Sequence, residues 1–182
     1  MPPAAGFALF ASAIGHCGIA WGEGARTIVG TLLPEGNPAA TGSRMQGRFP
    51  GVREVTPPAS VQLMIDRIQA SLDGNEDDLR DLDLDMDGVP AFHQRVYAFA
   101  RTIKPGLTLS YGEVAAALGE PGASRAVGQA LGHNPFAPVV PCHRILAAGN
   151  RSGGFSAGGG VATKLKMLER EGAWFGTERG LF

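Results

Sequence analysis

Cysteine is scarce in this sequence, which holds only Cys17 and Cys142 among its 182 residues. Two thiols cannot build the disulfide framework of a small secreted domain, and a chain of this length can bury a core without such links. We therefore expect both thiols to be free. Lone cysteines of this kind favour a reducing, cytoplasmic compartment.

A long hydrophobic run is also absent. The apolar stretch at residues 7–14 is far shorter than the roughly 20 residues that a membrane-spanning helix needs. No lysine or arginine precedes it, although a signal peptide would carry one there. We therefore predict a core strand at this position, and no membrane partner.

Charge is modest overall but divided unevenly along the chain. Charged residues make up 18% and hydrophobic residues 44% of the sequence, which is typical of a globular protein. Residues 1–92 contain six arginines, no lysine and twelve acidic residues, for a net charge of −6. Residues 93–182 contain ten basic and five acidic residues, for a net charge of +5. An asymmetry of this kind is consistent with nucleic-acid contact by the second half, and solvated faces produce such splits as well.

The first half is predicted to be a small α+β unit. Its signals are alternating or β-branched apolar runs for strands, and an apolar repeat at helical spacing that follows Ser60 as a capping residue. The predicted elements are strands at 7–13 and 18–21 around a hairpin turn at Gly15–Gly18, a strand at 27–33, a loop at 34–58, a helix at 61–72 and a half-buried strand at 82–86.

The turn-forming sequence Asp87–Pro90 is the predicted boundary between two domains, residues 1–88 and 89–182. Beyond it, Ser110 and Glu113 have the spacing of a capping box at the start of a helix. A short glycine-containing turn then leads into a further helix, which is the pattern of a helix-turn-helix. The predicted helices cover 91–103, a segment from Ser110 to about 118, 123–131 and 162–171, with a loop at 132–160. The predicted fold class is α+β, with a small antiparallel-sheet N-terminal domain followed by a mostly helical C-terminal domain.

Cys142 is the candidate nucleophile, because it lies in the sequence Pro141-Cys142-His143-Arg144. A lone cysteine is most often buried and inert, but histidine and arginine are unusual neighbours for a core residue. A nearby imidazole can populate the reactive thiolate.

A catalytic histidine in turn needs a carboxylate to fix its tautomer. Glu169 and Glu171 on the last predicted helix are the candidates, and Leu165 and Leu168 are expected to mark its buried face. Helical periodicity leaves both carboxylates open.

The second half resembles the O6-alkylguanine-DNA alkyltransferases, also called methylated-DNA–protein-cysteine methyltransferases. The resemblance covers about residues 91–175 and depends on five stretches that occur in family order. These stretches are Ser110-Tyr111-Gly112-Glu113-Val114-Ala115, Ser124-Arg125-Ala126-Val127-Gly128, Asn134-Pro135, Pro141-Cys142-His143-Arg144-Ile145, and Phe155-Ser156 with the later Lys164, Glu171 and Gly172.

This resemblance implies a catalytic role for each of several residues. Cys142 would accept the alkyl group, and His143 would deprotonate it through a water molecule. Glu171, rather than Glu169, would orient His143, and Asn134 would brace the turn before the active-site loop.

The resemblance also implies how the substrate is held. Tyr111 would address N3 of a flipped guanine, Ser156 would address O6, and Ile145 would line the pocket. Arg125 would fill the gap left in the duplex. The small residues around it, Ala123, Ala126 and Gly128, would let their helix lie close to the floor of a groove.

The implied partner is double-stranded DNA that contains O6-alkylguanine, bound by a monomer that needs no cofactor and turns over once. Such a protein is expected in the cytoplasm with the nucleoid, or in a eukaryotic nucleus. His16 and Cys17 are adjacent but lack further ligands, so we predict no metal site. Two features depart from the family pattern: Phe155 replaces a tyrosine or tryptophan, and the segment 156–161 is longer.

Three other functions remain as alternatives. A damage-binding relative without repair activity would replace the acceptor cysteine, whereas this chain keeps Cys142. A helix-turn-helix regulator that senses alkylation would carry a dimerisation or effector domain, and none is evident. A cysteine hydrolase would draw its histidine from a distant part of the chain and would need an oxyanion-hole motif.

Overall fold

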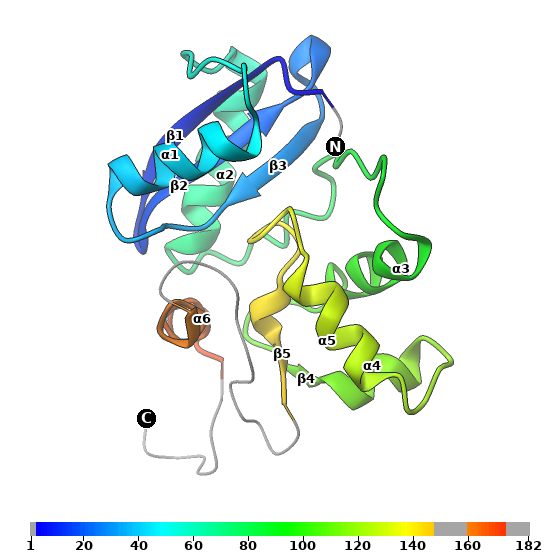
Figure 1. Cartoon of the computed structure of the whole chain (residues 1–182). Coiled ribbons are helices and arrows are strands. Elements are labelled where there is room, and N and C mark those ends of the chain that lie inside the picture. The colour runs from blue at the N-terminus through cyan, green and yellow to red at the C-terminus, as the bar shows by residue number, and fades with distance from the viewer. Residues whose placement is uncertain (1–2, 148–159, 174–182) are drawn as a thin grey trace.

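A computed structural model describes residues 3–147 and 160–173 of the chain. A three-stranded antiparallel sheet with strand order β1-β2-β3 forms one end of the molecule (Figure 1). Its strands are β1 (Gly6–Ser12), β2 (Gly15–Trp21) and β3 (Ile28–Leu32), with a short 3-10 helix η1 (Glu23–Ala25) before β3. Two helices, α1 (Pro38–Arg48) and α2 (Ala59–Leu72), cover opposite faces of this sheet.

The hairpin between β1 and β2 turns earlier than predicted. His16 and Cys17 pair with Ala11 and Phe10 inside the ladder, so the predicted turn at Gly15–Gly18 is wrong. The Ser12 hydroxyl donates to the Gly15 carbonyl over 2.6 Å, and Gly15 has a φ of 124° that favours glycine. The side chain of Ser12 and the backbone freedom of Gly15 therefore close the turn at residues 13–14.

Helix α1 lies within the segment that the sequence predicts as a loop, and that prediction is wrong. Asn37 caps the helix by accepting a hydrogen bond from the Ala40 N–H over 2.8 Å, and Pro38 occupies the first helical position. Only Thr41 and Met45 of this helix are buried. The helix therefore shows no broad apolar stripe in the sequence.

Helix α2 confirms the predicted apolar face but not its predicted cap. The helix begins at Ala59 after Pro58, and Ser60 lies inside it. The Ser60 hydroxyl instead donates to the Ala25 carbonyl over 2.7 Å, so it joins α2 to η1.

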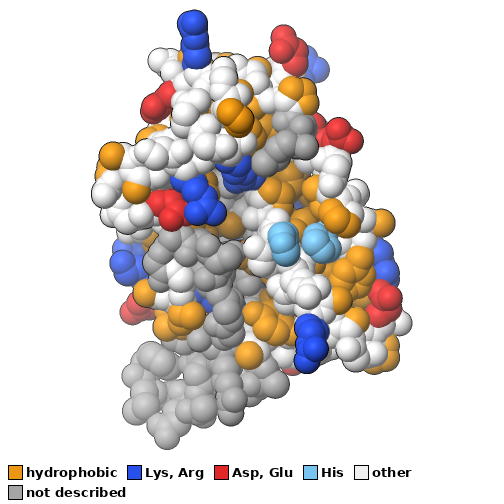
Figure 2. Space-filling model, viewed as in Figure 1, with side chains coloured by type: hydrophobic (Ala, Val, Ile, Leu, Met, Phe, Trp, Pro, Cys, Tyr) orange, Lys and Arg blue, Asp and Glu red, His pale blue; other side chains and the backbone are white. Residues whose placement is uncertain are grey.

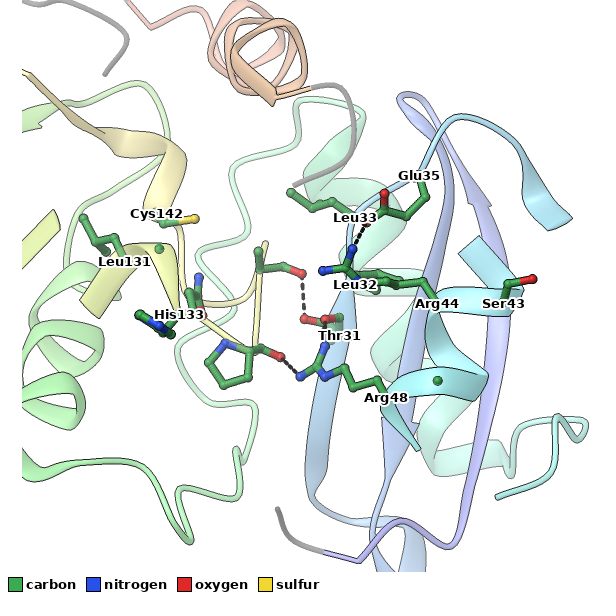
Figure 3. A pocket seen from close by; sticks show the side chains of 15 residues that line it. Thr31, Leu32, Leu33, Glu35, Ser43, Arg44, Arg48, Leu131, His133 and Cys142 are labelled. Carbon is green, nitrogen blue, oxygen red and sulfur yellow. Dashed lines mark hydrogen bonds and ion pairs between the residues drawn. The ribbon is translucent and has the colours of Figure 1, made fainter. Parts of the chain in front are cut away.

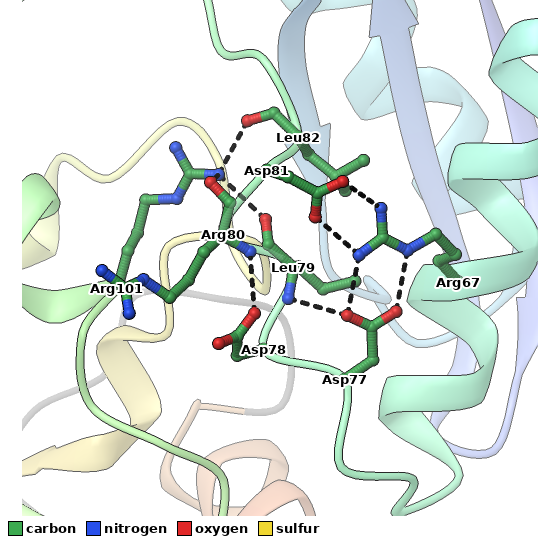
Figure 4. Close-up of polar contacts among 8 residues, drawn as sticks. All are labelled: Arg67, Asp77, Asp78, Leu79, Arg80, Asp81, Leu82 and Arg101. Atoms are coloured by element: carbon green, nitrogen blue, oxygen red, sulfur yellow. Dashed lines mark hydrogen bonds and ion pairs between the residues drawn. The ribbon is translucent and has the colours of Figure 1, made fainter.

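No strand forms at residues 82–86, where one is predicted. Leu82 and Leu84 are buried as the alternation suggests, but the contact with β3 is a single parallel bridge between Ile28 and Leu84. Arg101 donates to the carbonyls of Leu79, Arg80 and Leu82 (Figure 4). Within the predicted strand, the Leu82 carbonyl therefore binds a side chain rather than a neighbouring strand.

A second arginine, Arg67 of α2, binds the same segment through Asp77 and Asp81 at 2.8 Å each (Figure 4). These two arginines fix the segment that leads from the first half into the second.

The second half begins with α3 (Ala91–Ala100), which ends three residues earlier than predicted. The helix-turn-helix consists of α4 (Tyr111–Ala117) and α5 (Ser124–Gly132), which pack against each other. Ser110 caps α4 by accepting a hydrogen bond from the Glu113 N–H over 3.0 Å, which confirms half of the predicted capping box. The predicted α+β class, with a small sheet followed by a mostly helical half, is confirmed.

The predicted loop at 132–160 contains two short elements. A 3-10 turn η2 (Cys142–Arg144) leads into β5 (Ile145–Leu146), which pairs in parallel with β4 (Leu109–Ser110). The last described helix is α6 (Gly160–Arg170), and Gly172 follows it with a φ of 68°. Across the described residues, no helix is both long enough and apolar enough to cross a membrane.

Candidate active site

Cys142 is the first residue of η2, at the point where the chain enters β5. Its side chain is nearly enclosed, with 6% of the residue exposed. The pairing of β5 with β4 places this turn beside the start of α4, because β4 runs directly into Tyr111. Cys17 lies instead in the core under the sheet, and both thiols are free.

The Cys142 thiol is held in its protonated form by its surroundings. Burial raises its pKa, whereas hydrogen bonding by Asn134, the charge of Lys164 and the N–H groups of Cys142 and His143 lower it in part. A buried thiol needs a base to remove its proton, but these groups are placed to stabilise the thiolate once it forms.

His143 provides a base in a fixed tautomer. Its Nε2 lies 2.7 Å from Oε1 of Glu171, and the histidine and glutamate side chains are only 2% and 7% exposed. Burial lowers the pKa of His143 although Glu171 opposes that shift, so the imidazole is neutral at neutral pH. A neutral ring facing a carboxylate carries its hydrogen on Nε2, which leaves Nδ1 as the basic atom.

That Nδ1 atom is buried and has no hydrogen-bond partner within the described part of the chain. An unpaired acceptor in a buried site is unfavourable. The arrangement therefore presents a basic nitrogen one residue after a protonated thiol.

Arg144 completes the site by binding the same carboxylate as His143. Its Nη2 lies 2.7 Å from Oε1 of Glu171, and its Nη1 donates to the Ile103 carbonyl over 2.7 Å. Burial would raise the pKa of Glu171, but hydrogen bonds and charge from His143 and Arg144 outweigh it and lower the pKa to about 2. Glu171 is therefore ionised at neutral pH.

The buried face of α6 settles which glutamate faces inward. It consists of Lys164, Met167 and Leu168, and Glu171 continues this spacing into the turn that follows the helix. Glu169 is exposed. The expectation that Leu165 marks the buried face is wrong, because Leu165 is half-buried and Lys164 beside it is 1% exposed.

Lys164 is a member of the site that the residue pattern did not single out. Its Nζ donates to the Ile145 carbonyl over 2.8 Å and lies 5.9 Å from the centre of the Tyr111 ring. Burial lowers its pKa to about 8. The signal for it in the sequence was a lysine seven residues before Glu171, at the spacing of one helix face.

In the sequence, Arg144 stands out only as an unusual neighbour of Cys142. Its two-sided contact with Glu171 and the Ile103 carbonyl depends on the fold, since 41 residues separate Arg144 from Ile103. No local pattern in the sequence indicates such a contact.

The other predicted pocket residues lie around the same centre. Ile145 is fully buried, and Tyr111 is half-buried, with a pKa raised by burial and by Cys142. Asn134 donates to the Val140 carbonyl over 2.9 Å and accepts from the Phe136 N–H over 2.9 Å. Ser156 and Phe155 lie outside the described residues.

Helix α5 carries the predicted nucleic-acid contacts. Arg125 is exposed in its first turn, and the described part of the chain gives it neither a hydrogen bond nor an ion pair. A side chain at Gly128 would have no described neighbour within 4 Å. On the face shown in Figure 2, Lys and Arg side chains lie at several places over both halves of the molecule.

A groove of about 600 Å³ separates the two halves next to Cys142. Figure 3 shows Cys142 and Leu131 on one wall, with Thr31, Arg44 and Arg48 on the other. Within the described ranges, no three His, Cys, Asp or Glu side chains are placed to hold a metal ion.

Comparison with known proteins places these features in a family context. Residues 91–173 match the family model described as "6-O-methylguanine DNA methyltransferase, DNA binding domain". A methylated-DNA–protein-cysteine methyltransferase of Mycobacterium tuberculosis is 43% identical over 114 residues, which cover 63% of this chain and 67% of the relative. One from Methanothermobacter thermautotrophicus is 34% identical over 155 residues, covering 85% and 78%.

The structure also resembles solved ones. The crystal structure of Mycobacterium tuberculosis OGT in complex with DNA shares 33% sequence identity and a TM-score of 0.70 with this chain. The match covers 91% of this chain and 92% of that one.

Proposed function

The chain belongs to the methylated-DNA–protein-cysteine methyltransferase family, and we propose that it repairs DNA by taking the alkyl group of O6-alkylguanine onto Cys142. The observation that carries this proposal is the buried thiol of Cys142 followed directly by the His143–Glu171 pair, joined at 2.7 Å. A nucleophile, a base and an orienting carboxylate are the parts that a thiol needs to act at neutral pH.

The proposed transfer is a single displacement at the alkyl carbon. The thiol proton passes through a water molecule to Nδ1 of His143, and the sulfur forms a bond to the carbon as its bond to guanine O6 breaks. The electron pair of the broken bond stays with guanine, which then takes up a proton. Tyr111 addresses N3 and Ser156 addresses O6 of the departing base. The thioether has no simple route back, so each molecule acts once.

Delivery of the base depends on double-stranded DNA at α5. A methylated guanine is buried in the base stack, and flipping it out costs a few kcal/mol. Arg125 fills the gap that the base leaves, while Ala123, Ala126 and Gly128 let α5 approach the groove. The proposed division of labour gives residues 89–182 the DNA contacts and the chemistry, in a cytoplasmic, nucleoid-associated monomer.

The test is to weigh the intact protein and its peptides after incubation with a duplex that carries O6-methylguanine. We expect a gain of one methylene on the peptide that contains Cys142, never more than one per molecule. The matched control is Cys17→Ser, which removes the other thiol and should leave the gain intact, whereas Cys142→Ser should bind the duplex without gaining mass. A wild-type protein that binds this duplex and stays unmodified would show a damage-binding protein instead.

A further inference from the structure

Arg48 is a half-buried cation that reaches from the first half of the molecule to the second. It lies in the last turn of α1, where its Nη1 donates to the Thr31 carbonyl over 2.6 Å and its Nη2 donates to the Pro135 carbonyl over 2.8 Å (Figure 3). Burial and the charge of Arg44 lower its pKa to about 10, so it stays protonated at neutral pH. No carboxylate pairs with it among the described residues.

Thr31 of β3 binds the same turn from beside Arg48. Its N–H donates to the Pro135 carbonyl over 2.9 Å, and its hydroxyl donates to the Ala137 carbonyl over 2.6 Å. Thr31 is 4% exposed. Three hydrogen bonds from the first half therefore end on two carbonyls of the short turn that follows α5.

The absence of a side chain at Gly30 of β3 makes room for the Arg48 guanidinium. A Cβ atom at Gly30 would lie 2.6 Å from Nη2 of Arg48 and 2.8 Å from the Phe49 ring. Real Cβ atoms essentially never approach that closely, so a glycine at this position of β3 leaves the space that the side chain occupies.

The turn that Arg48 and Thr31 hold is the one that contains Asn134. The Asn134 side chain is fixed by its bonds to Phe136 and Val140. The Val140 carbonyl also accepts the N–H of Cys142 over 2.9 Å, so Asn134 lies beside the nucleophile, and hydrogen bonding by Asn134 lowers the pKa of the Cys142 thiol. Only one peptide bond separates Asn134 from the carbonyl of Pro135. A shift of that carbonyl would therefore move the amide that faces the thiol.

From these contacts we propose that Arg48, together with Thr31, is a positioning residue for the transfer reaction. The first half grips the turn at residues 134–137 and so holds Asn134 against Cys142. This inference rests on the proposed function for the identity of the reaction, but its geometry is independent of it. On this proposal, the acidic first half helps to set the reactivity of Cys142 in the second half.

The experiment measures the reactivity of the Cys142 thiol against pH, using iodoacetamide and peptide mass spectrometry to separate Cys142 from Cys17. The variants are Arg48→Met, which keeps the length of the side chain but removes its donors, and Thr31→Val, which removes only the hydroxyl. Arg44→Met is the matched control, since Arg44 lies on the same helix, has a side chain that is 60% exposed and forms an ion pair with Glu35 at 3.5 Å.

We expect the pH midpoint of Cys142 alkylation to rise in Arg48→Met and, to a smaller extent, in Thr31→Val. Transfer from the methylated duplex at neutral pH should fall by about tenfold for each pKa unit of that rise, because the thiolate fraction falls in proportion. Affinity for unmodified duplex should not change. Arg48→Lys, which can reach one carbonyl but not both, should recover part of the loss, and Arg44→Met should match the wild type.

A merely structural role would lower the melting temperature without moving the pH midpoint. Folded Arg48→Met and Thr31→Val proteins with wild-type pH profiles would overturn the proposal. If Arg48→Met does not fold, the milder Thr31→Val decides the question by the same two criteria. A wild-type protein that never gains a methyl group would refute the proposed function, and the iodoacetamide profiles would still test the positioning role.

Discussion

Among the described side chains of the active site, Glu171 is the one that holds both His143 and Arg144 in place. It binds His143 and Arg144 at 2.7 Å each, and the Gly106 N–H approaches its other oxygen at 3.4 Å. One carboxylate therefore fixes the tautomer of the base and neutralises the arginine beside it. The predicted effects of changing it are large for that reason.

Replacing Glu171 with glutamine should slow transfer to Cys142 by at least roughly a hundredfold, because the amide no longer holds the hydrogen of His143 on Nε2. The measurement is the single-turnover rate with a methylated duplex. Glu169→Gln is the matched control, two residues away and exposed, and should react at the wild-type rate. Equal losses in the two variants would contradict the role given to Glu171.

Glu171 should also contribute to stability in acid in a defined direction. Its pKa is about 2 in the folded protein and about 4.3 in an unfolded chain. A depressed pKa gives stability that is complete above the unfolded value and is lost as the pH falls toward the folded one. The contribution is on the order of 3 kcal/mol at neutral pH.

Urea unfolding at pH 6 and pH 3 tests this. The difference in unfolding free energy between wild type and Glu171→Gln should be larger at pH 6 and should shrink at pH 3. A difference that is the same at both pH values would mean that the carboxylate is not stabilised as its contacts imply.

At the residue scale, the site residues that could be predicted from the sequence are those that lie next to one another in a single motif. Cys142 and His143 are adjacent in the sequence, so both could be named as candidates without knowledge of the fold. The choice between Glu169 and Glu171 could not be made from hydrophobicity, because the inward face of α6 begins with Lys164. Lysine side chains are mostly exposed in proteins, so Lys164 would be predicted on the surface unless its hydrogen bond to the Ile145 carbonyl were known.

At the scale of elements, α1 shows why one helix could not be predicted. Its buried face is two residues wide, and Met45 packs against β2 because Gly18 has no side chain. A Cβ atom at Gly18 would lie 2.6 Å from Sδ of Met45. The information that makes α1 a helix is therefore divided between the helix and a strand nearly thirty residues earlier.

Gly18→Ala should destabilise the protein by about 1–3 kcal/mol through overpacking against Met45. The added Met45→Ala change should offset part of this, so that the double variant loses less than the sum of the two single losses. Chemical denaturation of the four proteins measures the coupling. Strictly additive losses would show that the two residues do not share this space.

Helix α5 carries a prediction of its own. Arg125→Ala should slow transfer from duplex DNA more than transfer from the free O6-alkylated base, because only the duplex has a gap to fill. The rates with both substrates, compared with those of Lys166→Ala, an exposed basic residue on α6, give the measurement. A loss of the same size with both substrates would rule out a role in holding the base pair open.

At the scale of the whole molecule, delivery and chemistry take place in different electrostatic settings. Arg125 is exposed, whereas Cys142, His143 and Arg144 are all buried. Salt weakens contacts between exposed cations and phosphates because it lowers the free energy gained when counterions are released, but it scarcely screens an enclosed pair.

Raising the salt concentration should therefore weaken duplex binding steeply while changing the rate with free O6-methylguanine by less than about twofold. Titrations of a labelled duplex and mass measurements of the free-base reaction, both over the same salt series, give the two slopes. A reaction with the free base that fell as steeply as duplex binding would contradict the enclosure of the site.

The position of the sheet at one end of the molecule, with α4 at the other (Figure 1), has a consequence for the moment before contact. The end with the sheet belongs to the half with a net charge of −6, and α4 and α5 belong to the half with +5. The protein is thus an electric dipole, and the field around a polyanion exerts a torque on it. We therefore expect the protein to approach DNA with its acidic first half turned away, which would shorten the orientational search for a productive encounter before any side chain touches a phosphate.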